Sequence, residues 1–423
     1  MRYILTFLVV FFFCSSSFAQ TLVHNFKWVK YDFENAETAF FIMNDGKIEY
    51  IERGAPSDSI LRKFSKNNID ADQQYLYPSF IVPHVPLGLA EVDAVRSSVD
   101  HSEVGDINPN SRSIVAYNMH SKIIPTIRAN GILYAQTTPR SGLISGSSSV
   151  VRLLGDYKED VLVKEDDAIH INWPNRFKST GWWAEPGNVK KNDKQKKQTI
   201  QLADFFGDAL SYYKNDSLKT KNINLKYEAM KKVFSGESAL FVSASNVKDI
   251  LDVIKFANDF HVPKLVIVGG EESWKVREVL KENNVAVVIN RLHRLPENED
   301  EDIFLPYSLP AMLHEKGIKF CFNYSGDMEI MGSRNLPFVA GTAVAHGLPY
   351  EIALRAITIN TAEILGVDDK IGNIEVGKEA SFFLSKGDAF DMKNNNITTV
   401  FIKGKKVDLE DNHQVKLYNK YKE

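Results

Sequence analysis

The sequence has little cysteine. Only Cys14 and Cys321 occur in 423 residues. If Cys14 leaves with an N-terminal leader, Cys321 has no cysteine to pair with, so an intrachain disulfide is excluded even in an oxidising compartment. Cys321 is then expected to be a small buried apolar residue.

The sequence also lacks an excess of charge of one sign. It has 51 Lys and Arg against 54 Asp and Glu, a formal net charge of −3. This balance gives no general attraction to nucleic acid or to anionic lipid, and the basic run at 190–197 is expected to be a solvated loop. Hydrophobic residues make up 44% and charged residues 25%, an ordinary globular composition.

Long apolar runs are absent except near the start. The run from Tyr3 to Phe13 follows Arg2 and precedes small residues up to Ala19. It is shorter than the roughly 20 residues that span a bilayer, and the pattern is typical of a cleaved secretory signal. Residues 1–19 are therefore predicted to be a signal peptide, and the mature chain to be periplasmic or secreted without a membrane span.

Short strands are predicted at both ends of the remaining chain. The sequence Asn44-Asp45-Gly46-Lys47 favours a tight hairpin turn. Similar short runs return in IGNIEVGKEASFFLS and TTVFIKGKKV. Because neither set can bury its apolar face alone, residues 20–78 and 367–410 are predicted to form one small β-sandwich module.

Residues 79–366 alternate between short apolar runs and helical patterns, which predicts a parallel α/β fold. Seven such runs are clear and SSSVVRLL offers an eighth, which favours a closed TIM-like (β/α)8 barrel. No Gly-x-Gly-x-x-Gly follows the first run, which argues against a dinucleotide-binding sheet. An insertion at 175–235 carries Trp182 and Trp183, which either line a ligand cleft or pack the insertion onto the barrel. The seven clear runs are FIVPHV, GILYAQT, AIHINW, ALFVSAS, KLVIVGG, VAVVIN and KFCFNYS.

Three segments resemble the amidohydrolase superfamily, in the branch of imidazolonepropionases and related cyclic-amide hydrolases. They are YLYPSFIVPHVPLGL, IRANGILYAQTTPRSGLISGSSSVV and, most specifically, GLPYEIALRAITINTAEILGVDDKIGNIEVGKEASFFL. The resemblance runs from about Phe26 to about Val407. It implies hydrolysis of non-peptide C–N bonds in cyclic or linear amides, with zinc or another divalent metal as cofactor.

The metal ligands that the resemblance implies are mostly substituted. The His-x-His pair of the first barrel strand falls on His84-Val85-Pro86, and proline cannot bind a metal. The histidines of the fifth and sixth strands fall near Ser243 and Gly269, and the aspartate of the eighth near Ser325. A hydrolytic metal needs about three protein ligands and an open position, so no metal ligand is assigned.

Polar residues nevertheless follow the predicted strands, at the end of a barrel where sites assemble. His84 and Asp327 are the candidate catalytic pair, since a histidine and a carboxylate can exchange protons without a metal. The candidate ligand-binding residues are Arg291, Glu271, Ser243 and Ser325.

Three functions fit this sequence. A working metal hydrolase follows from the resemblance alone. A weakly active or non-catalytic relative would bind a small ligand, form a homo-oligomer or join an active family member, and the substituted residues favour this interpretation. An exported hydrolase with a non-standard or metal-independent site around His84 and Asp327 is the alternative.

The signal peptide gives a direct prediction. Cleavage after Ala19 should leave Gln20 as the first residue of the mature protein, because the charged start, short apolar core and small-residue site occur together. Mass spectrometry of the exported chain checks this. A chain that keeps Cys14 with an attached lipid would contradict both the cleavage and the export of a soluble protein.

Overall fold

The structure is a computed structural model that describes residues 20–92, 94–181, 185, 187–215, 223–296, 298, 300–326 and 328–422. The predicted signal peptide, Trp182, Trp183 and Asp327 lie outside the described residues. Within these ranges, no helix has both the length and the apolar character needed to cross a bilayer.

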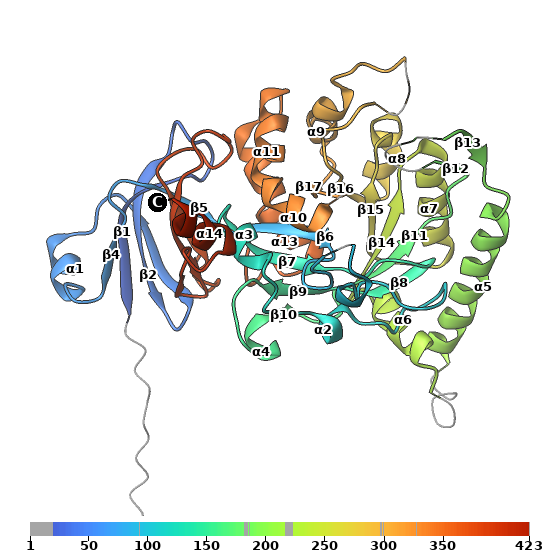
Figure 1. The fold of residues 1–423 in the computed structure, drawn as a ribbon, viewed down its shortest axis with the longest axis horizontal. Coiled ribbons are helices and arrows are strands. Elements are labelled where there is room, and N and C mark those ends of the chain that lie inside the picture. Colours follow the sequence, from blue (N-terminus) through green and yellow to red (C-terminus); the bar gives the residue numbers. More distant parts are fainter. Residues whose placement is uncertain are drawn as a thin grey trace, which may run out of the picture.

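Strands from the two ends of the chain pair in one eight-stranded sheet (Figure 1). The predicted hairpin turn is present, with positive φ at Asp45 (+47°) and Gly46 (+72°). These strands join in a single hydrogen-bonded sheet, so the predicted sandwich of two packed sheets is not confirmed. The strands are β1 (Thr21–Trp28), β2 (Glu37–Asn44), β3 (Lys47–Arg53), β4 (Asn68–Asp70), β5 (Tyr75–Pro78), β18 (Phe382–Ser385), β19 (Ile397–Ile402) and β20 (Lys405–Val407).

Each of the seven clear apolar runs forms a strand of the α/β part. The ladders β6 with β7 and β11 through β17 are parallel, as buried runs separated by helices predict. The strands are β6 (Phe80–Val85), β7 (Ile132–Thr137), β11 (Ala168–Asn172), β14 (Ala239–Ala244), β15 (Leu265–Gly269), β16 (Ala286–Ile289) and β17 (Phe320–Phe322).

The eighth run differs from the prediction of a closed parallel barrel. The run, residues 147–154, forms β9 (Ser149–Arg152), which pairs antiparallel with β7, and the strand just before it, β8 (Ile144–Ser147), pairs antiparallel with β11. With β10 (Leu162–Lys164), the described strands form two sheets, β10-β9-β7-β6 and β17-β16-β15-β14-β11-β8. The α/β fold is therefore consistent with a TIM barrel, although no ladder among the described strands closes the ring.

Helices surround these sheets, and the terminal sheet lies at one end of the molecule (Figure 1). They are α1 (Asp58–Lys63), α2 (Ser113–Ala116), α3 (Ile124–Arg128), α4 (Lys158–Val161), α5 (Gln195–Lys214), α6 (Leu225–Ser235), α7 (Val247–Asp259), α8 (Arg277–Glu282), α9 (Leu305–Glu315), α10 (Glu329–Gly332), α11 (Leu336–Ala345), α12 (Tyr350–Ala356), α13 (Ile359–Leu365) and α14 (His413–Tyr421), with short 3-10 turns η1 (Arg96–Ser98), η3 (Ser273–Val276) and η4 (Ser333–Asn335).

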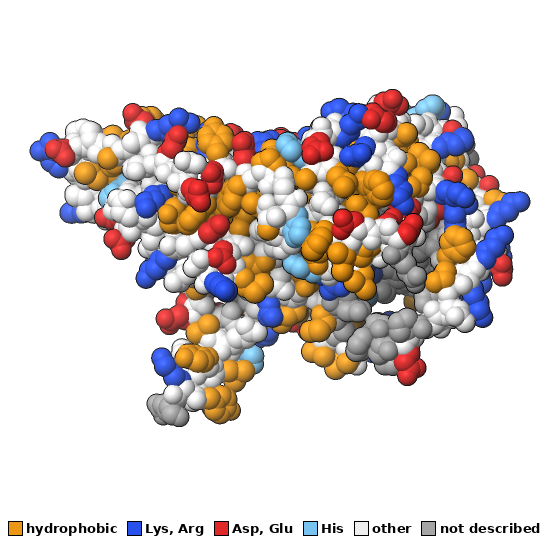
Figure 2. Space-filling model, turned by 90° about the horizontal axis from the view of Figure 1, so that it is seen from above, with side chains coloured by type: hydrophobic (Ala, Val, Ile, Leu, Met, Phe, Trp, Pro, Cys, Tyr) orange, Lys and Arg blue, Asp and Glu red, His pale blue; other side chains and the backbone are white. Residues whose placement is uncertain are grey.

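The insertion contains the two predicted helices, α5 and α6, and a small hairpin of β12 (Phe177–Ser179) and β13 (Val189–Lys191). Helix α6 packs on β11 and β14, so it takes the place of a barrel helix on the outer face. In the face shown in Figure 2, acidic and basic side chains are interspersed, in agreement with the balanced composition.

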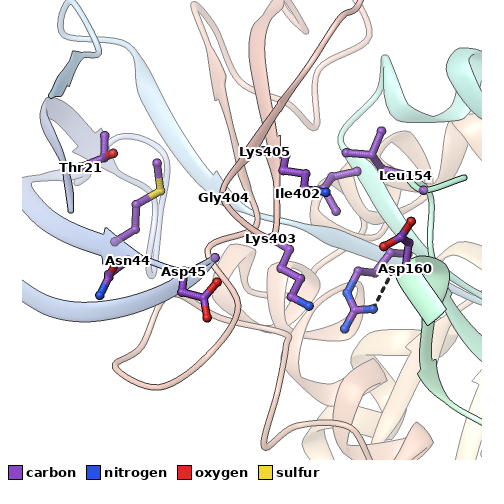
Figure 3. A pocket seen from close by; sticks show the side chains of 13 residues that line it. Thr21, Asn44, Asp45, Leu154, Asp160, Ile402, Lys403, Gly404 and Lys405 are labelled. Atoms are coloured by element: carbon purple, nitrogen blue, oxygen red, sulfur yellow. Dashed lines mark hydrogen bonds between the residues drawn. The ribbon is translucent and has the colours of Figure 1, made fainter. Parts of the chain in front are cut away.

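A buried ion pair joins the α/β part to the terminal sheet. Arg152 on β9 donates from Nε to Glu379 Oε2 at 2.7 Å, and both side chains are less than a tenth exposed. Tyr134 on β7 donates to the same carboxylate oxygen at 2.8 Å. Beside this pair lies a cleft of about 440 Å³ that Asp45 and Lys403 also line (Figure 3).

Breaking this pair should destabilise the protein strongly. In Arg152→Met, Glu379 would stay buried without its cation, and the free energy of unfolding should fall by about 3 to 5 kcal/mol. Urea denaturation of the variant and the wild type measures the difference. Arg53→Met is the control, because Arg53 and Glu37 pair at the surface with exposures of 58% and 46%, and its effect should stay below about 1 kcal/mol. Equal losses in the two variants would contradict this role.

Candidate functional site

His84 lies at a bulge near the end of β6. Between Val82 and Val85 the strand advances three residues while β7 advances two, from Ala135 to Thr137. His84 has a φ of +50°, a left-handed conformation that costs a non-glycine residue about 1 kcal/mol. Hydrogen bonds to its backbone oppose this cost.

These backbone contacts come from the ends of two strands, β7 and β17. The His84 amide donates to Gln136 Oε1 at 2.9 Å. Its carbonyl accepts from Arg140 Nη2 at 2.9 Å and from Asn323 Nδ2 at 3.3 Å. Asn323 follows β17 and His84 lies on β6, so this amide bridges two strands that form no ladder with each other among the described residues.

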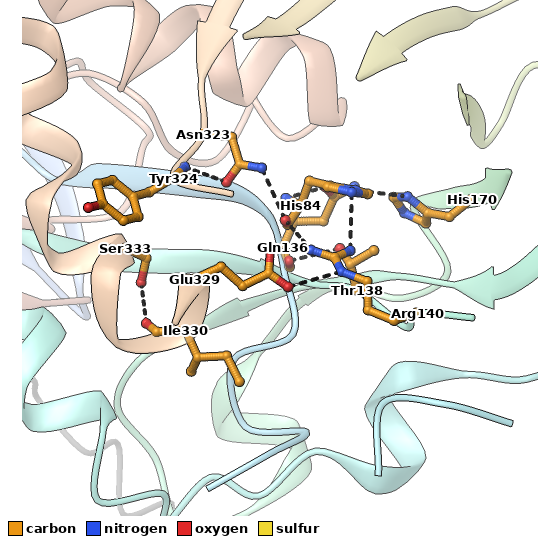
Figure 4. A network of polar contacts seen from close by, with 10 residues as sticks. All are labelled: His84, Gln136, Thr138, Arg140, His170, Asn323, Tyr324, Glu329, Ile330 and Ser333. Atoms are coloured by element: carbon orange, nitrogen blue, oxygen red, sulfur yellow. Dashed lines mark hydrogen bonds and ion pairs between the residues drawn. The ribbon is translucent and has the colours of Figure 1, made fainter. Parts of the chain in front are cut away.

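Arg140 occupies one side of the His84 ring (Figure 4). Its Nη1 lies 3.1 Å from His84 Nε2, and its Nε and Nη2 donate to both carboxylate oxygens of Glu329 at 3.2 and 3.1 Å. Glu329 begins α10, and both of these charged side chains are 20% exposed. The guanidinium is therefore held in a two-pronged ion pair while it faces the imidazole.

His170 occupies the other side of the His84 ring. It lies on β11, and its Nδ1 is 3.2 Å from His84 Nδ1. Its Nε2 is 2.8 Å from Ser148 Oγ, which donates to Asp167 Oδ1 at 2.8 Å. Gln136 Nε2 donates to Ser148 Oγ at 3.1 Å and to Asp167 Oδ2 at 2.7 Å. A continuous polar network thus runs from Glu329 to Asp167.

The arginine fixes the direction of every proton in this network. A guanidinium only donates, so His84 Nε2 must carry a lone pair and His84 Nδ1 a proton. His84 then donates to His170 Nδ1, which leaves His170 Nε2 to donate to Ser148. Ser148 in turn donates to the carboxylate of Asp167.

The charge states follow from burial. Burial lowers the pKa of His84 well below its usual range, and the charges of Arg140 and His170 lower it further. Burial, followed by the charge of Arg140, also lowers the pKa of His170. Burial raises the pKa of Asp167 to about 6, although hydrogen bonds from Ser148 and Gln136 oppose the shift. Both imidazoles are neutral at pH 7, and the network ends in a carboxylate.

The predicted ligand-binding residues lie at other strand ends. Glu271, after β15, accepts from Asn290 Nδ2 at 3.0 Å. Arg291, after β16, stacks over Tyr324 with its guanidinium carbon 5.7 Å from the ring centroid. Ser243 and Ser325 are half-buried on β14 and after β17. Within the described part of the chain, no hydrogen bond or ion pair links these four residues to His84.

Asp327, the catalytic partner predicted for His84, lies outside the described residues. At the end of β17, the residue that reaches His84 is Asn323 rather than Ser325. Asn323 lies two residues before Ser325, near which the resemblance places the aspartate of the eighth strand. The side chain is an amide that donates to a carbonyl, so it brings no negative charge to this point.

Sequence reasoning missed most of the network. Its other members are Gln136, Arg140, Ser148, Asp167, His170, Asn323 and Glu329. A signal existed, since Gln136 and His170 lie in predicted buried strands, where a polar residue needs a buried partner. The pairing of His170 with His84 could not be found from the sequence alone, because it depends on the contact between β6 and β11 across the fold.

The described residues contain no group of three or more His, Cys, Asp or Glu side chains arranged to hold a metal ion. His84 and His170 are two imidazoles, one fewer than the roughly three ligands of a hydrolytic metal centre. Both ring nitrogens of each histidine are engaged by protein groups, and one nitrogen of His84 faces a permanent cation.

Comparisons with known proteins agree with the fold. Residues 307–407, from α9 to β20, match the model of the Amidohydrolase family. An imidazolonepropionase from Flavobacterium psychrophilum is 26% identical over 162 residues, which cover 34% of this chain and 39% of that protein. Amidohydrolase tasK from Hapsidospora irregularis is 22% identical over 171 residues, which cover 39% of this chain and 17% of the relative.

The fold is shared over nearly the whole chain. The crystal structure of an amidohydrolase from Thermotoga maritima MSB8 superposes with a TM-score of 0.76 at 22% identity, covering 92% of this chain and 99% of the other. Phenylurea hydrolase B gives a TM-score of 0.53 at 13% identity, covering 92% and 97%. The family match and the two relatives support the amidohydrolase superfamily for this chain, and the shared fold agrees with it.

Proposed function

We propose that this chain is a superfamily member without a hydrolytic metal centre, which binds a small ligand or acts as a non-catalytic partner of an active relative. The observation that supports it most is the position of Arg140. Its guanidinium faces Nε2 of His84, the one histidine that remains at the metal-ligand positions implied by the resemblance. A divalent cation at this nitrogen would have to displace a cation that Glu329 holds in place.

The electrostatics support the same proposal. Arg140 keeps its charge at any physiological pH, so it repels a second cation at the same site. The nearest acidic side chain of the network is Glu329, and the arginine already neutralises it. Pro86, Ser243 and Gly269, at the other positions implied by the resemblance, supply no imidazole.

A metal-independent hydrolase is the alternative. General acid–base catalysis by His84 requires a ring nitrogen that can reach the substrate. Both ring nitrogens of His84 lie within hydrogen-bond distance of protein groups, and the side chain is almost fully buried. These contacts favour a structural role for His84 in a ligand-binding or partner protein. Export to the periplasm or medium remains part of the proposal.

The metal content tests the proposal directly. Protein purified without chelator should contain no stoichiometric zinc or other divalent metal, and EDTA should leave the melting temperature unchanged, because an ion that binds only the folded state would stabilise it. Elemental analysis and melting curves measure both. Pro86→His should gain neither zinc nor C–N hydrolysis, since it restores one ligand alone. About one zinc per wild-type chain, with melting lowered by EDTA, would establish the hydrolase instead.

The charge of Arg140 should control the titration of His84. In Arg140→Met the nearby positive charge is lost, so the pKa of His84 should rise towards its ordinary value while burial still holds it down. NMR titration of the imidazole signals measures the shift. The pH dependence of the free energy of unfolding should change in the variant as well. A histidine with a lowered folded-state pKa loses stabilisation as pH falls below about 6.5, and this loss should be smaller in the variant.

Two variants control this measurement. Arg140→Lys keeps the positive charge and should leave the pKa of His84 low. Arg53→Met removes a surface arginine of the terminal sheet and should leave the titration unchanged. The same His84 titration in wild type and Arg140→Met would show that the guanidinium does not set the charge state of the ring.

A further inference from the structure

A buried arginine outside the His84 network lacks a carboxylate partner. Arg128 ends α3 and is only 8% exposed. Its single hydrogen bond to a described residue runs from Nη1 to the Leu153 carbonyl at 3.0 Å, and its Nε is buried without an acceptor. No ion pair joins it to a carboxylate in the described ranges. An unpaired buried charge is unfavourable, so this guanidinium requires an anion.

Arg128 lines a cavity of about 330 Å³, here called the Arg128 cavity. Its walls come from α3, the segment after β9, strand β20 and helix α14, so it lies where the α/β part, the terminal sheet and the C-terminal helix meet. Lys122 and Lys406 also line it, and neither forms an ion pair within the described part of the chain. Three cationic side chains without ion-pair partners therefore converge on one cavity.

The acidic residues of the same cavity form no ion pair with Arg128, although the charges of Asp411 and Asp408 partly oppose the lowering of its pKa by burial. Asp411 pairs with Lys416 at the surface, where the two side chains are 63% and 62% exposed. Asp156 and Asp408 are also exposed, and neither approaches Arg128 closely enough to form an ion pair. The acidic groups thus lie in solvent at the rim, while the arginine is at the buried wall.

We propose that the Arg128 cavity binds a small tetrahedral oxyanion, either inorganic phosphate or the phosphate group of a phosphomonoester. A guanidinium offers several donors in one plane, and the lysines add point charges from other directions, which suits an ion with acceptor oxygens on all sides. The volume leaves room beyond a phosphate group. This site is independent of the function proposed for the barrel centre.

Binding of the anion should also stabilise the docking of the C-terminal helix, α14. His413 and Lys416 of α14 line the cavity, so an anion there would contact the helix and α3 together. The helix has no fully buried side chain of its own and packs on α3 by few contacts. Its amide hydrogens should therefore exchange more slowly when the anion is bound.

The test is titration of the full-length mature protein with inorganic phosphate and, separately, with phenyl phosphate, at constant ionic strength maintained with sodium chloride. The melting temperature should rise saturably with either ligand, and hydrogen exchange of α14 should slow at the same concentrations. A stronger response to inorganic phosphate identifies the free ion as the ligand. A stronger response to phenyl phosphate identifies an organic phosphate.

Variants locate the binding site. Arg128→Met should weaken phosphate binding at least about tenfold, while Arg53→Met should bind as the wild type does. If Arg128→Met does not fold, the double variant Lys122→Gln/Lys406→Gln replaces it and should also bind more weakly. The absence of a saturable response in the wild type would overturn the proposal. So would an unchanged response in both cavity variants.

Discussion

The permanent charge of Arg140 is the constraint on which the centre of this protein depends. A guanidinium cannot accept a proton, so its contact with His84 determines which nitrogen of that ring is protonated. This protonation state in turn determines which group donates in each hydrogen bond from His84 through His170 and Ser148 to Asp167. Each group in this network therefore has a defined set of donor and acceptor roles.

The two parts of the chain are joined by a second buried charge. Arg152 and Glu379 connect β9 to the segment before β18, and Tyr134 completes the carboxylate's hydrogen bonds. Such a pair contributes little net stability compared with apolar packing, but separating its members is costly. It therefore fixes the position of the terminal sheet. Arg128 shows the contrasting case, a buried guanidinium for which the described residues supply no carboxylate.

Membership of the superfamily and the chemistry of the barrel centre are separate questions. The matched residues 307–407 form the last helices of the α/β part and the returning strands of the terminal sheet, which are parts of the scaffold. The structural similarity to other members, at 22% identity or less, concerns the fold alone. Chemistry depends on the side chains at the strand ends, and there the chain has its own set of residues.

The sequence by itself determined the strands and helices, because buried parallel strands read as short apolar runs and the Asp45-Gly46 turn has its own signature. It also showed that Pro86 cannot bind a metal. Only the tertiary structure decided that the eighth run pairs antiparallel, as β9 with β7, and that the terminal strands share one sheet. It alone brought Arg140 and His170 to His84, across 56 and 86 residues of sequence. Local patterns record which residues are buried, whereas the partner of a buried polar group depends on which strands meet in space.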